Sequence, residues 1–171
     1  MNGIVVREER PDDADVIREV TRQAFASANH ADGSEPLIPE RLRQRGALTL
    51  SLVAQAGGEV VGHVAVSPVE IAADDRPDRG WFGIGPLSVR PDMQRQGVGK
   101  ALMRECLARL RDTGAAGCVL AGDPEYYGRF GFASNAALAY ADVPNDYVLA
   151  LPFGDDPPAG TIHFDPAFGG A

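Results

Sequence analysis

Residues 94–100, Gln-Arg-Gln-Gly-Val-Gly-Lys, have the residue types and spacing of a phosphate-binding loop. An apolar, strand-like stretch precedes them and an amphipathic, helix-like stretch follows. The first N–H groups of a helix have no partner inside the helix, and the helix dipole places partial positive charge there. Glycine at positions 97 and 99 lets an anion come close to the backbone. We interpret the segment as a diphosphate site; the alternative is an ordinary strand-to-helix turn with glycines for packing.

Two well-known nucleotide loops do not fit this segment. The dinucleotide pattern G-x-G-x-x-G requires a third glycine where Leu102 stands. The P-loop pattern G-x-x-x-x-G-K-[ST] requires glycine at Gln94 and a hydroxyl residue at Ala101. The segment therefore carries neither the nicotinamide nor the nucleotide-triphosphatase signature.

The helix after the loop has the clearest periodicity in the chain. Its apolar positions follow the helical spacing, and Gly114 is placed to end the helix. The apolar face comprises Gly99, Leu102, Met103, Cys106, Leu107 and Leu110. This pattern predicts a helix that covers one face of a sheet.

Strand-like and helix-like stretches fill the remaining chain. We predict strands at 4–7, 48–55, 60–71, 81–89, 117–121, 147–151 and 161–164, and further helices at about 11–26, 40–45 and 124–131. Gly57-Gly58 predicts a hairpin turn, while Pro68 and Gly85-Pro86 predict local distortions in their strands. The length of 171 residues favours a single domain over residues 1–171. The expected fold is α/β, a mixed, largely antiparallel twisted sheet flanked by helices.

Three ordered motifs resemble the GNAT superfamily of N-acetyltransferases. Gln94-x-x-Gly97-x-Gly99 matches the acetyl-CoA pattern Q/R-x-x-G-x-G/A at every fixed position. Residues 87–92, Leu-Ser-Val-Arg-Pro-Asp, resemble the end of the family's fourth strand, and Tyr127 with Gly131-Phe132 resembles its Y-x-x-x-G-F signature. The resemblance covers residues 4–152, and the tail resembles a bacterial subgroup of predicted N-acetyltransferases. It implies the acyl-CoA N-acyltransferase fold with splayed central strands, with acetyl-CoA as cosubstrate and no metal.

The resemblance also implies roles for individual residues. The cofactor-binding set is Leu87, Ser88, Val89, Gln94, Arg95, Gln96, Gly97, Val98, Gly99 and Lys100. A backbone N–H within residues 87–89 would stabilise the oxyanion of acyl transfer. Tyr127 would donate a proton to the departing thiolate, because a phenol with a pKa of about 10 can protonate a thiolate whose thiol has a pKa near 8.5. Tyr126 is expected to point elsewhere on its helix.

The general base is not determined by these motifs. Many family members have a glutamate on the fourth strand, but residues 81–89 contain none. Glu70 and His63, on the preceding strand, are candidates, and solvent or a backbone-held water is an equal alternative. The missing glutamate keeps open a non-catalytic acyl-CoA sensor or interaction protein on the same fold. An unrelated anion-binding domain is a third hypothesis.

Composition limits the partners. A net charge of -8 argues against binding to nucleic acid or to an anionic membrane. Around the loop, Arg90, Arg95 and Lys100 outnumber Asp92, as expected of a phosphate site in an acidic protein. No apolar run approaches the ~20 residues of a membrane span, and the first ten residues show no signal-peptide pattern, which predicts a cytoplasmic location.

Cysteine and histidine usage predicts no metal site. His30, His63 and His163 are far apart in the chain, and the two cysteines, Cys106 and Cys118, read as core residues. The expected partner is a small-molecule or peptide amine acceptor, and a homodimer is left open.

Overall fold

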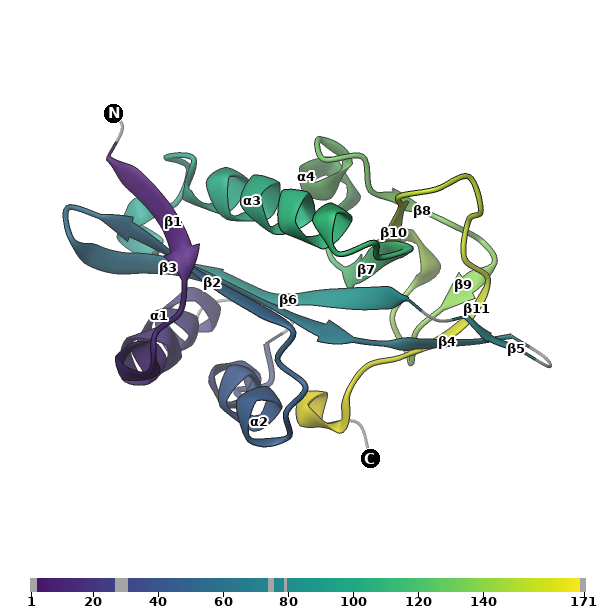
Figure 1. Cartoon of the computed structure of the whole chain (residues 1–171), viewed down its shortest axis with the longest axis horizontal. Helices are drawn as coiled ribbons and strands as arrows, with labels where there is room; N and C mark the ends of the chain where they lie inside the picture. The colour runs from purple at the N-terminus through teal and green to yellow at the C-terminus, as the bar shows by residue number, and fades with distance from the viewer. Residues whose placement is uncertain (1–2, 27–30, 74–75, 79, 170–171) are drawn as a thin grey trace.

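The structure is a computed structural model that describes residues 3–26, 31–73, 76–78 and 80–169. Among these residues, seven strands form the main sheet, in the order β1-β2-β3-β6-β7-β10-β8 (Figure 1). Neighbouring strands are antiparallel except for β6 and β7, which are parallel. The strands are β1 (Ile4–Glu8), β2 (Leu50–Ala56), β3 (Glu59–Pro68), β6 (Trp81–Val89), β7 (Gly117–Ala121), β8 (Ala133–Ser134) and β10 (Val148–Pro152).

Helices cover both faces of this sheet. Figure 1 shows α1 (Ala14–Phe25) and α2 (Ile38–Gln44) on one face, and α3 (Val98–Asp112) and α4 (Pro124–Gly128) on the other. Short 3-10 helices occur at Pro11–Asp13, Glu35–Leu37, Pro91–Met93, Asn145–Tyr147 and Pro166–Phe168. The predicted mixed α/β architecture is confirmed, and apart from residues 60–71 the predicted helices and strands have bounds within a few residues of those expected.

The apolar face of α3 packs on the sheet, as its periodicity predicts. Leu102, Met103 and Cys106 are fully buried and belong to one core cluster with residues of β2 and β3. A Cβ on Gly62 would lie 2.7 Å from Val98 Cγ1 and 3.0 Å from Leu102 Cδ1. Glycine at position 62 of β3 therefore allows α3 to approach the sheet closely, which positions the start of the helix.

The opposite face is covered by α1 and α2. Ile17 and Val20 of α1 pack against Val53 of β2, and α1 also contacts β3 and β6. Leu42 of α2 packs near Ala65 of β3. The two helices therefore bury the side chains that β2, β3 and β6 direct to this face of the sheet, several of which are polar.

One predicted strand is divided in the structure. Residues 60–71 were expected to form one strand, but β3 ends at Pro68 and the chain continues as β4 (Glu70–Ala73) in a second sheet. Proline has no N–H to donate, which favours the end of pairing at this position. In the described residues this second sheet has the order β5-β4-β11-β9, with β5 (Arg76–Asp78), β11 (Gly160–His163) and β9 (Leu138–Ala139). The sequence did not predict it.

Candidate functional site

Strands β6 and β7 separate in the middle of the main sheet. They pair at Trp81, Phe82 and Gly83 of β6 only, although β6 continues to Val89 and β7 to Ala121. On the other side of β6, Leu87 pairs with Val64 and Ile84 with Val66, so β6 takes one residue more than β3 over this interval. The bulge falls at Gly85-Pro86, as predicted, and the strands are splayed from there onward.

The peptide groups of Leu87 and Val89 face the space between the splayed strands. The Arg90 N–H donates to the Val61 carbonyl of β3 at 2.8 Å. Because alternate residues of an antiparallel strand face the same neighbour, Ser88 also faces β3, while Leu87 and Val89 face away from it. The Gln94 side-chain amide donates to the Val89 carbonyl at 3.2 Å. The N–H groups of Leu87 and Val89 are thus directed to the splay, where β7 does not pair with them.

The glycine loop leads from β6 into an open helix N-terminus. Gly97 precedes α3 with a φ of 89°, Arg95 has a φ of 64°, and no side chain caps the helix. The carbonyl of Gly97 accepts the Ala101 N–H at 3.0 Å, so the helix begins directly after the loop. The N–H groups of Val98, Gly99 and Lys100 then have no acceptor within the helix. This arrangement fits an anion, as the glycine spacing predicts.

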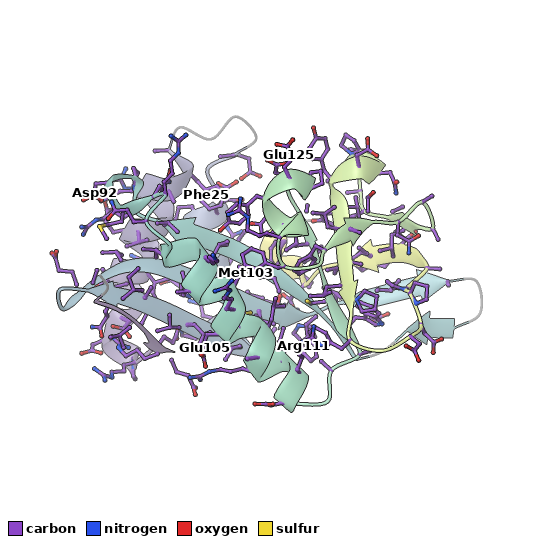
Figure 2. All side chains as sticks on the ribbon, turned by 90° about the horizontal axis from the view of Figure 1, so that it is seen from above. Phe25, Asp92, Met103, Glu105, Arg111 and Glu125 are labelled. Atoms are coloured by element: carbon purple, nitrogen blue, oxygen red, sulfur yellow. The ribbon has the colours of Figure 1, made fainter. Side chains whose placement is uncertain are left out.

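Charge around the loop favours an anionic ligand. Arg95 and Lys100 are exposed and form no ion pair with the described part of the chain. Arg90 is paired with Asp92, with its Nε 2.7 Å from Oδ1. Figure 2 shows Asp92 near the end of α1 at Phe25, and Arg90 and Asp92 line a surface pocket with Arg22 of α1. The start of α3 is therefore a basic patch on an acidic protein.

Tyr126 of α4 lies close to the first turn of α3. The hydroxyl of Tyr126 lies against the first turn of α3, where a Cβ on Gly99 would be 2.7 Å from Tyr126 Oη. The sequence places Tyr126 elsewhere on its helix from Tyr127, and in the structure its hydroxyl lies at the N-terminal end of α3. A larger residue at position 99 would displace this hydroxyl from its place beside the helix.

Tyr127 lies on the β7 side of the splay. Its ring packs edge-on against Phe132 and belongs to the same apolar cluster as Leu87 and Val89. An added Cβ on Gly122, just after β7, would be 2.5 Å from its Cε2. The Tyr127 hydroxyl makes no hydrogen bond to a residue that the structure describes. Burial raises the pKa of this phenol well above its ordinary value, so the hydroxyl remains a hydrogen-bond donor at physiological pH.

His63 lies on the face covered by α1 and α2. It is fully buried on β3, directly opposite Ser88 of β6. Its Nε2 is 2.7 Å from the hydroxyl of Ser51, and that hydroxyl also bonds the carboxylate of Glu9. Arg43 of α2 binds Glu9 with both Nε and Nη2, each at 2.9 Å. Sequence reasoning named His63 alone; its three partners come from other segments and carry no motif.

Glu70 occupies a different part of the molecule. It is exposed on β4, opposite His163 of β11 in the second sheet. A hairpin separates Glu70 from Trp81 in the chain. Glu70 lies beyond the Trp81 end of β6, whereas the glycine loop follows the other end of that strand. The structure therefore does not bring Glu70 together with Leu87, Val89 and Tyr127.

The burial of His63 predicts a pH dependence of stability. Burial lowers the pKa of His63 from 6.5 to about 4, against the opposing effect of the Glu9 charge. The unfolded chain therefore binds a proton before the folded one does. We expect the contribution of His63 to the free energy of unfolding to be at its maximum above pH 6.5. This contribution should fall by about 3 kcal/mol as the pH is lowered to 4.

Denaturant unfolding at several pH values measures this loss. His63→Gln should flatten the slope between pH 6.5 and 4.5. His163→Gln, at an exposed position on β11, should retain it. An unchanged slope in His63→Gln would contradict the assignment.

Comparison with known proteins agrees with this geometry. A family model described as an acetyltransferase (GNAT) domain matches residues 5–134. The uncharacterized N-acetyltransferase YhbS of Escherichia coli strain K12 is 39% identical over 130 residues, which are 75% of this chain and 73% of that protein. Its crystal structure in complex with CoA superposes with a TM-score of 0.87 and 31% identity, covering 99% of this chain and 93% of that one.

A second solved structure shows the same fold. A GNAT family acetyltransferase from Brucella melitensis, crystallised in complex with acetyl-CoA, is 45% identical, with a TM-score of 0.84 over 96% of this chain and 97% of that one. The fold is therefore that of the acyl-CoA N-acyltransferases. The chain belongs to the GNAT family of acetyltransferases.

The described residues contain neither a metal-ligand cluster nor a membrane-spanning helix. No group of three or more histidine, cysteine, aspartate or glutamate side chains in the described ranges could hold a metal ion. No helix among those same residues is long and apolar enough to cross a membrane.

Proposed function

We propose that this protein transfers an acetyl group from acetyl-CoA to the primary amine of a small molecule or peptide, by direct attack in a ternary complex. As a GNAT acetyltransferase it uses acetyl-CoA as its cosubstrate. The observation that carries the proposal is the open N-terminus of α3 directly beside the splay of β6 and β7. An elongated ligand with an anionic diphosphate and an uncharged arm fits these two features together.

The loop and the first turn of α3 would bind the diphosphate. The contacts would come from the N–H groups of residues 95–100 and from the charges of Arg95 and Lys100. Gln94 would hold the loop against β6 through its bond to the Val89 carbonyl. The hydroxyl of Tyr126 would bond the ligand beside Gly99.

Leu87, Val89 and Tyr127 would act nearer to the thioester. The N–H groups of Leu87 and Val89 face the splay and can donate to the pantetheine arm and to the developing oxyanion. Ser88 is part of the predicted cofactor-binding set, but its peptide faces β3. Tyr127, across the splay, would donate its hydroxyl proton, or a hydrogen bond, to the departing thiolate.

Two measurements test the proposal. Calorimetry with acetyl-CoA should show saturable binding at micromolar concentrations. Thiol release from acetyl-CoA should then increase with one member of an amine panel that holds n-butylamine, spermidine, an aminoglycoside, lysine and a peptide with a free N-terminus. Binding without turnover on any amine would favour an acyl-CoA sensor instead, and no binding would refute both.

The acceptor class stays a proposal. We expect residues 27–46, between α1 and β2, to select the acceptor, because the corresponding region covers the acyl-acceptor site in the GNAT family; positions 27–30 lie outside the described residues. A cytoplasmic location and a homodimer also stay predictions, which fractionation and sedimentation would test.

A further inference from the structure

A chain of hydrogen bonds, buried at His63 and partly exposed at its other end, connects His63 to the protein surface. It runs from His63 Nε2 to the Ser51 hydroxyl, then to the Glu9 carboxylate and the Arg43 guanidinium. Glu9, Arg43 and Ser51 line a surface pocket of about 310 Å³. The acyl-transfer reaction as proposed above leaves this chain without a role.

The chain determines which nitrogen of His63 carries the proton. Burial would raise the pKa of Glu9, but the hydrogen bonds from Arg43 and Ser51 outweigh it, and its pKa lies below the ordinary value. Glu9 is therefore ionised at neutral pH and can only accept. Ser51 has a single hydroxyl proton and must donate it to Glu9, so it accepts from His63 Nε2–H. The neutral imidazole then has an unprotonated Nδ1.

His63 is paired with a residue of β6, the strand that borders the proposed site. Among the described residues His63 Nδ1 has no hydrogen-bond partner, and neither has the hydroxyl of Ser88. Both side chains are buried, and they stand opposite each other on β3 and β6. Buried polar atoms are rarely left unpartnered, and a water between two register-paired residues on one face of the sheet would give both atoms a partner. Ser88 lies between Leu87 and Val89, whose N–H groups face the splay.

We propose that His63 is the proton acceptor of the transfer reaction, acting through a water held between Nδ1 and the Ser88 hydroxyl, and that Ser51, Glu9 and Arg43 are its positioning residues. This inference rests on the proposed function. The amine nitrogen becomes far more acidic once it bonds to the acyl carbon, so a weak base suffices. Its proton passes to the water as the water's own proton moves to Nδ1. The imidazolium still donates its Nε2–H to Ser51, and the carboxylate of Glu9 stabilises its positive charge. The proton on Nδ1 later returns to solvent through the same water.

The charged groups around His63 suit this role. Glu9, which follows β1, and Asp13, which precedes α1, favour the imidazolium, whereas Arg43 of α2 opposes it. Arg43 is neutralised by its two bonds to Glu9. A carboxylate, a hydroxyl and an imidazole in series repeat the logic by which an acidic residue orients a catalytic histidine.

The first test uses the wild-type protein and needs no acceptor. Nitrogen-15 NMR of histidine-labelled protein distinguishes the two neutral tautomers, and His63→Gln assigns the signal. We expect the Nε2–H form at pH 7. Observation of a protonated Nδ1 would overturn the proposal.

The second test measures turnover with n-butylamine at saturating acetyl-CoA. Ser51→Ala should lower kcat by about 100-fold and leave the KM for acetyl-CoA unchanged, and Ser51→Thr should restore most of the rate. The deficit should narrow toward pH 10, because hydroxide can then accept the proton. Ser67→Ala is the matched control. Ser67 is a buried serine of β3 whose hydroxyl has no partner in the described structure, and it does not belong to the hydrogen-bond chain of His63. It should keep the wild-type kcat.

The outcomes separate this proposal from the function on which it rests. No turnover by the wild type with n-butylamine or any other panel amine would refute the transferase function, and the relay with it. Wild-type turnover with an undiminished kcat in Ser51→Ala, or an equal loss in Ser67→Ala, would overturn the relay alone.

Discussion

Gly97→Glu is expected to abolish measurable acetyl-CoA binding, which corresponds to at least about a 100-fold rise in Kd. Gly97 has a φ of 89° and stands at the N-terminus of α3. A side chain there costs about 1–2 kcal/mol of backbone strain. The new carboxylate would also occupy the positive end of the helix, where we place the diphosphate, and would repel it. Calorimetry with acetyl-CoA measures the loss directly.

Gly114→Glu is a closely matched control for this change. Gly114 follows the other end of α3, is exposed, and has a φ of 82° with open space around its Cβ position. The substitution adds the same charge and a similar strain to the same helix, so binding should persist. Gly97→Ala, which adds the strain without the charge, should have an intermediate effect. Equal affinities in Gly97→Glu and the wild type would refute the diphosphate site.

Tyr127→Phe is expected to lower kcat by about 100-fold with little change in the Kd for acetyl-CoA. The ring packs in the apolar cluster and would still do so as phenylalanine, so only the hydroxyl is lost. General acids contribute roughly this much or more to a rate. Because burial raises the pKa of Tyr127, the phenol keeps its proton as the pH rises. The wild type should therefore show no loss of kcat from this group up to about pH 10.

The neighbouring tyrosine provides the contrast. Tyr126→Phe removes the hydroxyl that lies at Gly99, so it should raise the Kd for acetyl-CoA several-fold and leave kcat near the wild-type value. Steady-state kinetics on both variants separate the two roles. A fall of kcat in Tyr126→Phe alone would mean that the acid has been assigned to the wrong tyrosine.

Local sequence was enough to predict the parts of the site that depend on near neighbours. The helical spacing of Leu102, Met103 and Cys106 predicted α3 and its buried face, since a helix repeats every few residues. The glycines at 97 and 99 predicted an open turn before the helix. Gly85-Pro86 predicted the irregularity in β6 where the strands splay, because proline cannot continue the ladder.

The hydrogen-bond chain around His63 could not be found in this way. The sequence contains Glu9, Ser51 and His63 as isolated polar residues, and nothing in their spacing relates them. The folded sheet brings them together because β1 pairs with β2 and β2 with β3. The position of Tyr126 beside Gly99 also depends on tertiary structure, because it follows from how α4 is placed after β7. Glu70 belongs to the second sheet because β3 ends at Pro68.

The sequence by itself determined a GNAT-like order of strands and helices and the loop that would bind a diphosphate, because these follow from periodicity, glycine and proline over short distances. Only the tertiary structure decided which peptide groups face the splay, which tyrosine meets α3, and which nitrogen of His63 contacts Ser51. Those properties depend on strand register and on contacts between segments far apart in the chain, and short-range patterns contain no information about either.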